Sequence, residues 1–144
     1  MDKNRILFGV VMFIATWLSG QHNPLITNYS TSDYKAHHQN WCVVEDDLGY
    51  LYSANTMGLL YGDGNSWEIT KLRSNKIVRS VAFHNGKIYS GSHGEIGYWV
   101  KDDCGKFEYK DLTGLIDDQS LKNEEVWNIV PDGNSIWFQS FSVL

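Results

Sequence analysis

The chain has 144 residues, enough for one domain with a real core, and 42% of them are hydrophobic and 14% aromatic. This composition excludes a disordered or low-complexity chain, and the six Trp favour strands over helices. The formal net charge is -5 and no cluster of Lys or Arg interrupts the acidic balance, which argues against nucleic-acid binding by this segment.

Residues 1–20 have the pattern of a secretory signal peptide. Lys3 and Arg5 precede the apolar run 6–18, and small residues ending at Gly20 follow it. The run is shorter than the roughly 20 residues that span a bilayer, so we expect cleavage after Gly20, with an uncleaved membrane anchor as the alternative. The mature chain is then exported, with no membrane contact except through this segment or through a longer parent chain.

An internal repeat is the strongest signal in the rest of the sequence. At an offset of 37 residues, the segment 41–61 matches 78–98, and a third copy begins near Val126 at an offset of 48 from the second. Repeats of this length are typical of solenoids and propellers. The identical pairs in the first two copies are Val44 with Val81, Gly49 with Gly86, Tyr52 with Tyr89, Ser53 with Ser90 and Tyr61 with Tyr98; with three residues added to one turn, Trp67 matches Phe107.

Each copy is interpreted as four short strands separated by turns rich in Gly, Asn and Asp, which tolerate the positive φ of tight hairpins. Four strands in about 40 residues is the size of one propeller blade. We therefore predict an all-β fold of about two and a half four-stranded blades, the last truncated, after an extended segment at 21–40. The blades are expected near 41–72, 78–112 and 126–144, with strands at 41–45, 50–54, 58–61 and 67–70 in the first and at 78–83, 87–91, 97–100 and 107–110 in the second.

Each copy also carries an apolar strand and a turn with Gly, and in the first two copies a glycine then precedes Leu or Ile and, two residues later, Tyr. With this pattern the chain resembles the two-component regulator propeller repeat family, and more particularly the N-terminal periplasmic sensor region of large LuxR-type regulators and hybrid sensor histidine kinases. The segments that carry the resemblance include Asn28-Tyr29-Ser30, Asp33-Tyr34-Lys35-Ala36, Gln39-Asn40-Trp41, Gly58-Leu59-Leu60, Val78-Arg79-Ser80 and Gly94-Glu95-Ile96-Gly97-Tyr98.

The resemblance implies a periplasmic fragment of a signal-transduction regulator that is not itself an enzyme. In this family a membrane-spanning helix and a cytoplasmic output, either a histidine kinase or a DNA-binding domain, follow the propeller. The C-terminal part of such a parent chain is thus an expected partner, and a carbohydrate-related small molecule is the expected ligand. The alternatives are a fragment of a propeller-fold polysaccharide-active enzyme and a structural propeller that binds proteins. Self-association is also expected, because an open array leaves strand edges unpaired.

No motif in the sequence indicates a catalytic, metal or cofactor site. His37 and His38 are expected to point to opposite sides of an extended segment, and the Asp-rich turns lack the full spacing of a calcium loop. The acidic pairs Asp117-Asp118 and Glu124-Glu125 are interpreted as solvated connections rather than as an acid and a base facing each other across a cleft. Cys42 and Cys104 are expected to be free thiols.

Three residues are candidates for ligand binding. Trp41 and Trp127 begin their repeats, where a propeller has its innermost strand, and Arg79 stands near the start of the second repeat. Aromatic faces suit the apolar faces of sugars. We therefore expect Trp41, Arg79 and Trp127 to lie near the central channel or the loops at one end of it.

Overall fold

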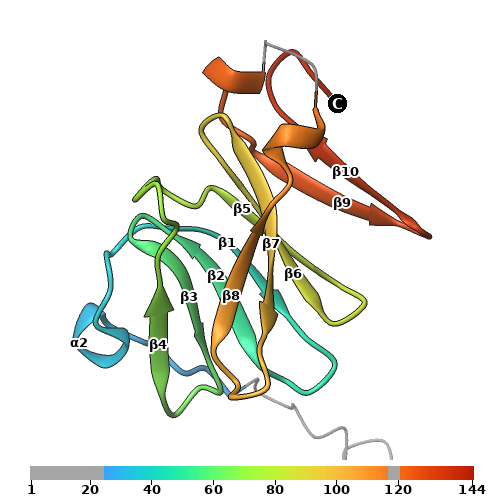
Figure 1. The fold of residues 1–144 in the computed structure, drawn as a ribbon. Coiled ribbons are helices and arrows are strands. Elements are labelled where there is room, and N and C mark those ends of the chain that lie inside the picture. Colours follow the sequence, from blue (N-terminus) through green and yellow to red (C-terminus); the bar gives the residue numbers. More distant parts are fainter. Residues whose placement is uncertain (1–24, 117–120) are drawn as a thin grey trace, which may run out of the picture.

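The computed structural model describes residues 25–116 and 121–144, and the expected signal peptide lies outside them (Figure 1). These residues form an all-β structure of three antiparallel sheets. The first sheet consists of β1 (Asn40–Glu45), β2 (Leu51–Asn55), β3 (Gly58–Gly62) and β4 (Trp67–Thr70), the second of β5 (Ser80–His84), β6 (Lys87–Ser92), β7 (Glu95–Lys101) and β8 (Phe107–Asp111), and the third of β9 (Asn128–Asp132) and β10 (Ser135–Gln139).

The prediction of four strands in each of the first two copies is confirmed, with bounds that differ by at most a few residues. Two further short elements, the 3-10 helices Thr113–Leu115 and Leu121–Asn123, follow β8 and precede β9 in the chain. The segment before β1, expected to be extended, contains the single helical turn α2 (Thr31–Tyr34). Ser30 caps this turn, and its backbone N–H and hydroxyl both donate to Asp33. No helix within the described residues has the length and apolar character needed to cross a bilayer.

The strand registers correct the alignment of the repeats by one residue. Glu45 pairs with Leu51, whereas the matching pair in the second sheet is Phe83 with Ile88, so the turn after β5 is one residue shorter than the turn after β1. Val43, rather than Val44, therefore takes the place of Val81. The outer strand shifts as well: Gly62 pairs with Trp67 and Trp99 with Tyr109, so Tyr109 and not Phe107 is the counterpart of Trp67.

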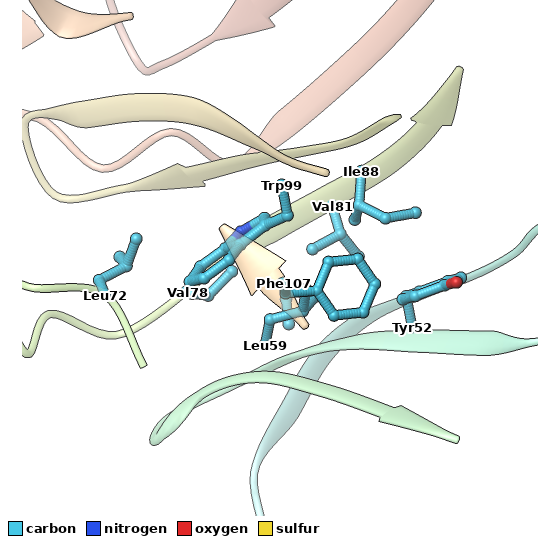
Figure 2. Close-up of a cluster of buried hydrophobic side chains, with 9 residues drawn as sticks. Tyr52, Leu59, Leu72, Val78, Val81, Ile88, Trp99 and Phe107 are labelled. Carbon is cyan, nitrogen blue, oxygen red and sulfur yellow. The ribbon is translucent and has the colours of Figure 1, made fainter. Parts of the chain in front are cut away.

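The three sheets follow one another with their inner strands in contact, β5 lying between β1 and β9 (Figure 1). A first apolar cluster fills the space between the first and second sheets. Tyr52 and Leu59 of the first sheet meet Trp99 of the second there, and all three are at most 3% exposed (Figure 2). A second cluster joins Ala82 and Ile96 to residues around β9. Each side chain buried in this way contributes roughly 1.5–3 kcal/mol to folding, so the sheet-to-sheet contacts hold the array together.

Polar side chains at the end of each second strand fasten the sheets to the segments before their first strands. Asn55, Ser92 and Ser140 occupy this same position in the three repeats and are at most 6% exposed. A buried polar group without a partner is costly, and here each one has a partner. Asn55 Nδ2 donates to the His37 carbonyl (2.6 Å), Ser92 Oγ to the Ile77 carbonyl (2.6 Å) and Ser140 Oγ to the Glu124 carboxylate.

Three of the tight turns are closed by an aspartate. Asp46 Oδ1 accepts backbone N–H bonds from Leu48 and Tyr50, both at 2.9 Å. Asp63 and Asp102 close their turns in the same way. This local bonding accounts for the acidic residues in these loops, in agreement with the interpretation that they serve the turns rather than a calcium ion.

Candidate functional site

The three residues singled out from the sequence lie together in the structure. With the corrected register, Trp41, Arg79 and Trp127 occupy equivalent positions in the three repeats. Each lies one residue before the first regularly paired residue of its inner strand. Those first pairs are Cys42 with Ala54, Ser80 with Gly91 and Asn128 with Gln139. Because the inner strands of the three sheets are neighbours, residues at this position converge although they are far apart in the chain. The repeat itself thus builds the cluster.

The guanidinium of Arg79 lies against both indoles. Its central carbon is 4.1 Å from the centroid of the Trp41 ring and 5.5 Å from that of Trp127. The two indoles meet edge to face, with centroids 6.4 Å apart and an interplanar angle of 70°. Phe141 packs against Trp127 at 5.7 Å and extends the aromatic surface. Such cation–π contacts are worth about 0.5–2 kcal/mol each and hold the guanidinium in a fixed orientation.

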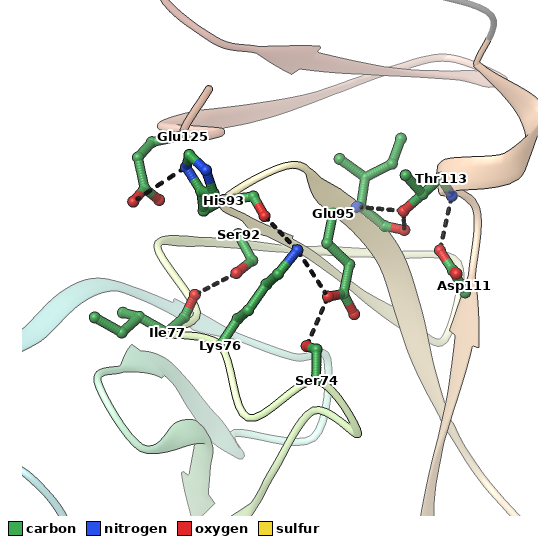
Figure 3. A network of polar contacts seen from close by, with 10 residues as sticks. Ser74, Lys76, Ile77, Ser92, His93, Glu95, Asp111, Thr113 and Glu125 are labelled. Carbon is green, nitrogen blue, oxygen red and sulfur yellow. Dashed lines mark hydrogen bonds and ion pairs between the residues drawn. The ribbon is translucent and has the colours of Figure 1, made fainter. Parts of the chain in front are cut away.

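A carboxylate completes the cluster. Arg79 Nε donates to Glu125 Oε2 at 3.2 Å, and the Arg79 and Glu125 side chains are only 15% and 24% exposed. His93 Nδ1 lies 3.8 Å from the other carboxylate oxygen of Glu125 (Figure 3). Among the described residues, the terminal nitrogens of the Arg79 guanidinium have no hydrogen-bond acceptor. The cluster therefore offers free N–H donors beside a carboxylate acceptor and two half-exposed indoles.

A network of polar contacts supports this cluster from the loop between β6 and β7 (Figure 3). Lys76 Nζ donates to the His93 carbonyl at 2.7 Å and lies 3.7 Å from Glu95 Oε2, which also accepts from Ser74 Oγ at 2.7 Å. His93 and Glu125 face each other in an isolated antiparallel bridge. The loop is thus tied on one side to the segment after β4 and on the other to the segment before β9.

Glu124 and Glu125, expected to be solvated, both make specific contacts. Hydrogen bonds from the Ser140 and Ser142 hydroxyls, together with the Ser142 backbone N–H, lower the pKa of Glu124 to about 2. Glu124 thereby fastens the segment after β10, while Glu125 pairs with Arg79. Sequence reasoning missed both roles because the partners are distant in the chain: Ser140 and Ser142 are 16 and 18 positions from Glu124, and Arg79 is 46 positions from Glu125. Asp117 and Asp118 lie outside the described residues.

The remaining candidates do not assemble into a second site. The rings of His37 and His38, expected to point apart, lie close together, with centroids 4.1 Å apart and an interplanar angle of 30°, because the chain bends at this point instead of running extended. Within residues 25–116 and 121–144 no three His, Cys, Asp or Glu side chains are grouped as metal ligands. Cys42 and Cys104 are both free thiols.

The main grooves lie away from the aromatic cluster. One, of about 540 Å³, opens between the first two sheets near Asp46, Tyr52 and Lys101. Another, of about 440 Å³, lies between the N-terminal segment and the outer face of the first sheet, beside Val43 and Trp67. Neither groove is lined by Trp41, Arg79 or Trp127.

Comparison of the chain with protein-family models, with curated proteins and with solved structures gives no significant match. The assignment of function therefore depends on the geometry described above.

Proposed function

We propose that this chain is the exported, ligand-binding part of a bacterial signal-transduction regulator, that its sheets are blades of a propeller, and that it has no catalytic activity of its own. The observation that carries the proposal is the convergence of Trp41, Arg79 and Trp127 from the equivalent position of three successive repeats. In a propeller that position lies beside the central channel, where loops of several blades meet and ligands are commonly bound.

The chemistry of the cluster suits a carbohydrate-related ligand. Trp41 and Trp127 are 39% and 40% exposed, and the accessible part of an indole can pack on the apolar face of a sugar ring. Sugar hydroxyls both donate and accept hydrogen bonds, and the Arg79–Glu125 pair presents donors and an acceptor side by side. Because the two main grooves do not include this cluster, we expect weak binding by this part of the protein alone.

The contacts of the site also support a route for signalling. Glu125 precedes the third sheet and Trp41 begins the first, so a ligand that binds Arg79 touches groups whose positions depend on how neighbouring sheets are packed. A ligand that binds one arrangement more tightly shifts the population toward it. In a full regulator that shift would be passed to a membrane-spanning part and an output domain.

Titration of the mature chain with a panel of neutral and acidic oligosaccharides, followed by tryptophan fluorescence, tests the proposal. The variant Arg79→Met keeps the apolar stem of the side chain and removes its charge and donors; we expect it to weaken binding by about tenfold, the equivalent of one hydrogen bond to a charged group. Arg73→Met, at an exposed arginine outside the cluster, is the matched control. If no oligosaccharide binds, or if both variants bind as the wild type does, the cluster is not a carbohydrate site.

A further inference from the structure

The outer edge of β10 differs from the equivalent edges in the other two sheets. β2 and β6 are paired on both sides, with β3 and β7 on their outer edges, whereas in the described part of the chain β10 is paired only with β9 (Figure 1). The sequence of β10, Ser135–Gln139, contains no charge and no proline. It therefore lacks the features by which edge strands usually avoid pairing with other chains.

The first two sheets show what covers this edge elsewhere in the same chain. Tyr52 on β2 pairs with Tyr61 on β3, and their rings stack at 6.4 Å. Tyr89 on β6 likewise pairs with Tyr98 on β7, with ring centroids 5.7 Å apart and an interplanar angle of 48°. The position of Tyr52 and Tyr89 is occupied on β10 by Trp137, which pairs with Val130 of β9 and has no aromatic partner on its open side.

The exposure of these side chains differs accordingly. Tyr52 is 3% exposed, but Trp137 and Val130 are each 45% exposed. A buried aliphatic residue lies two positions before each tyrosine of the third strands. It is Leu59 before Tyr61 and Ile96 before Tyr98, and these residues are 0% and 3% exposed. The third strand thus supplies the pattern of Leu or Ile, any residue, and Tyr, with the tyrosine opposite the aromatic residue of the second strand.

The interface between the second and third sheets also continues toward this edge. In the first sheet the pair Tyr52 and Tyr61 is covered by Phe107 of the next sheet, at 5.9 and 4.7 Å. The corresponding pair in the second sheet, Tyr89 and Tyr98, is contacted by Phe138 of β10 only at Tyr89. A strand added beside β10 would extend the established contact between these two sheets over Tyr98.

We propose that the outer edge of β10 is a docking site for an extended segment with the pattern Leu or Ile, any residue, Tyr, which adds antiparallel to β10 with its tyrosine opposite Trp137. Main-chain hydrogen bonds would provide most of the affinity, and the cross-strand aromatic pair would set the register. This surface is separate from the cluster around Arg79 and does not depend on the carbohydrate proposal.

The chain itself provides the probe. A labelled peptide with the sequence Glu95–Lys101, which carries the third-strand pattern, is titrated with the mature chain and followed by fluorescence anisotropy. We expect saturable binding that is weakened about tenfold when the tyrosine that corresponds to Tyr98 is replaced by alanine in the peptide, because the aromatic pair and its buried area are lost.

Two variants of the chain locate the binding. Trp137→Lys puts a charge at the centre of the edge strand and is expected to abolish binding, while Val43→Lys, at a 64% exposed apolar residue on β1, is expected to leave it unchanged. Absence of peptide binding, or equal loss in both variants, overturns the proposal. A dimer that sedimentation detects, that Trp137→Lys dissociates and that the peptide does not displace would instead identify a second copy of the chain as the occupant and overturn it too.

Discussion

Trp99 Nε1 donates a hydrogen bond of 2.9 Å to Ser90 Oγ on the neighbouring strand, between the first and second sheets, where the two residues are 1% and 2% exposed. The indole is the largest fully buried side chain described, and this bond satisfies its only polar atom. The hydrogen bond to Ser90 therefore allows the Trp99 indole to be buried in the first cluster without leaving its N–H unsatisfied.

Ser90→Ala should destabilise the chain by about 1–3 kcal/mol, because it leaves the buried indole N–H without its acceptor. Urea unfolding followed by circular dichroism measures the change. The control is the same substitution in a Trp99→Phe background, where no N–H remains to be satisfied and Ser90→Ala should cost less. An equal cost in the two backgrounds would mean that the hydrogen bond is not the reason for the loss.

Gly91 permits the close approach of the second sheet and the segment before β9. A Cβ at this position would lie 2.5 Å from Val126 Cγ1 and 2.6 Å from Ser80 Oγ, and Ser80 Oγ already donates to the Val126 carbonyl at 2.8 Å. Gly91→Ala should therefore cost about 1–3 kcal/mol by overpacking. Gly114→Ala, where nothing lies within 4 Å, is the control and should be nearly neutral in the same thermal unfolding experiment. A stable Gly91→Ala variant would contradict this close packing.

The strands were predictable from the sequence, and the contacts between sheets were not. Alternating apolar residues and turns with Gly, Asn and Asp are local signals, so the strands of the first two sheets were placed to within a few residues. The exact match of Val44 with Val81 favoured an alignment that the structure shifts by one residue. The shift comes from the longer turn closed by Asp46, and turn length is only weakly constrained by sequence.

The candidate site was predicted in part. Trp41, Arg79 and Trp127 stand near the starts of the repeats, which predicts that they lie together, and in the structure they do. For Glu125 the sequence predicts a solvated side chain, whereas the structure places it in contact with Arg79, 46 positions away in the chain. An ion pair of that kind depends on how two sheets pack and leaves no local signal.

Glu124 links the stability of the C-terminal segment to pH. Its folded-state pKa of about 2 lies below the ordinary value, so the stabilisation is fully present above the unfolded-state pKa of 4.5 and is lost as the pH falls toward 2. Hydrogen exchange of the Ser142 and Val143 amides should accordingly show constant protection from about pH 7 to pH 5 and a loss of protection below that, after correction for intrinsic exchange rates. Glu124→Gln should remove this pH dependence, and a wild-type profile in that variant would refute the assignment.

Arg79 and Glu125 should be coupled more strongly than an exposed ion pair on the same chain. Their side chains are 15% and 24% exposed, and the indole of Trp41 covers the guanidinium, so water screens their attraction less. Lys110 and Glu108, 2.7 Å apart but 45% and 49% exposed, provide the comparison. A double-mutant cycle with Arg79→Met and Glu125→Gln should give a coupling free energy of about 1 kcal/mol or more, against less than about 0.5 kcal/mol for Lys110→Met and Glu108→Gln. Equal coupling in the two pairs would show that the aromatic surroundings of Arg79 do not strengthen its bond to Glu125. The guanidinium would then be held mainly by its contacts with the two indoles.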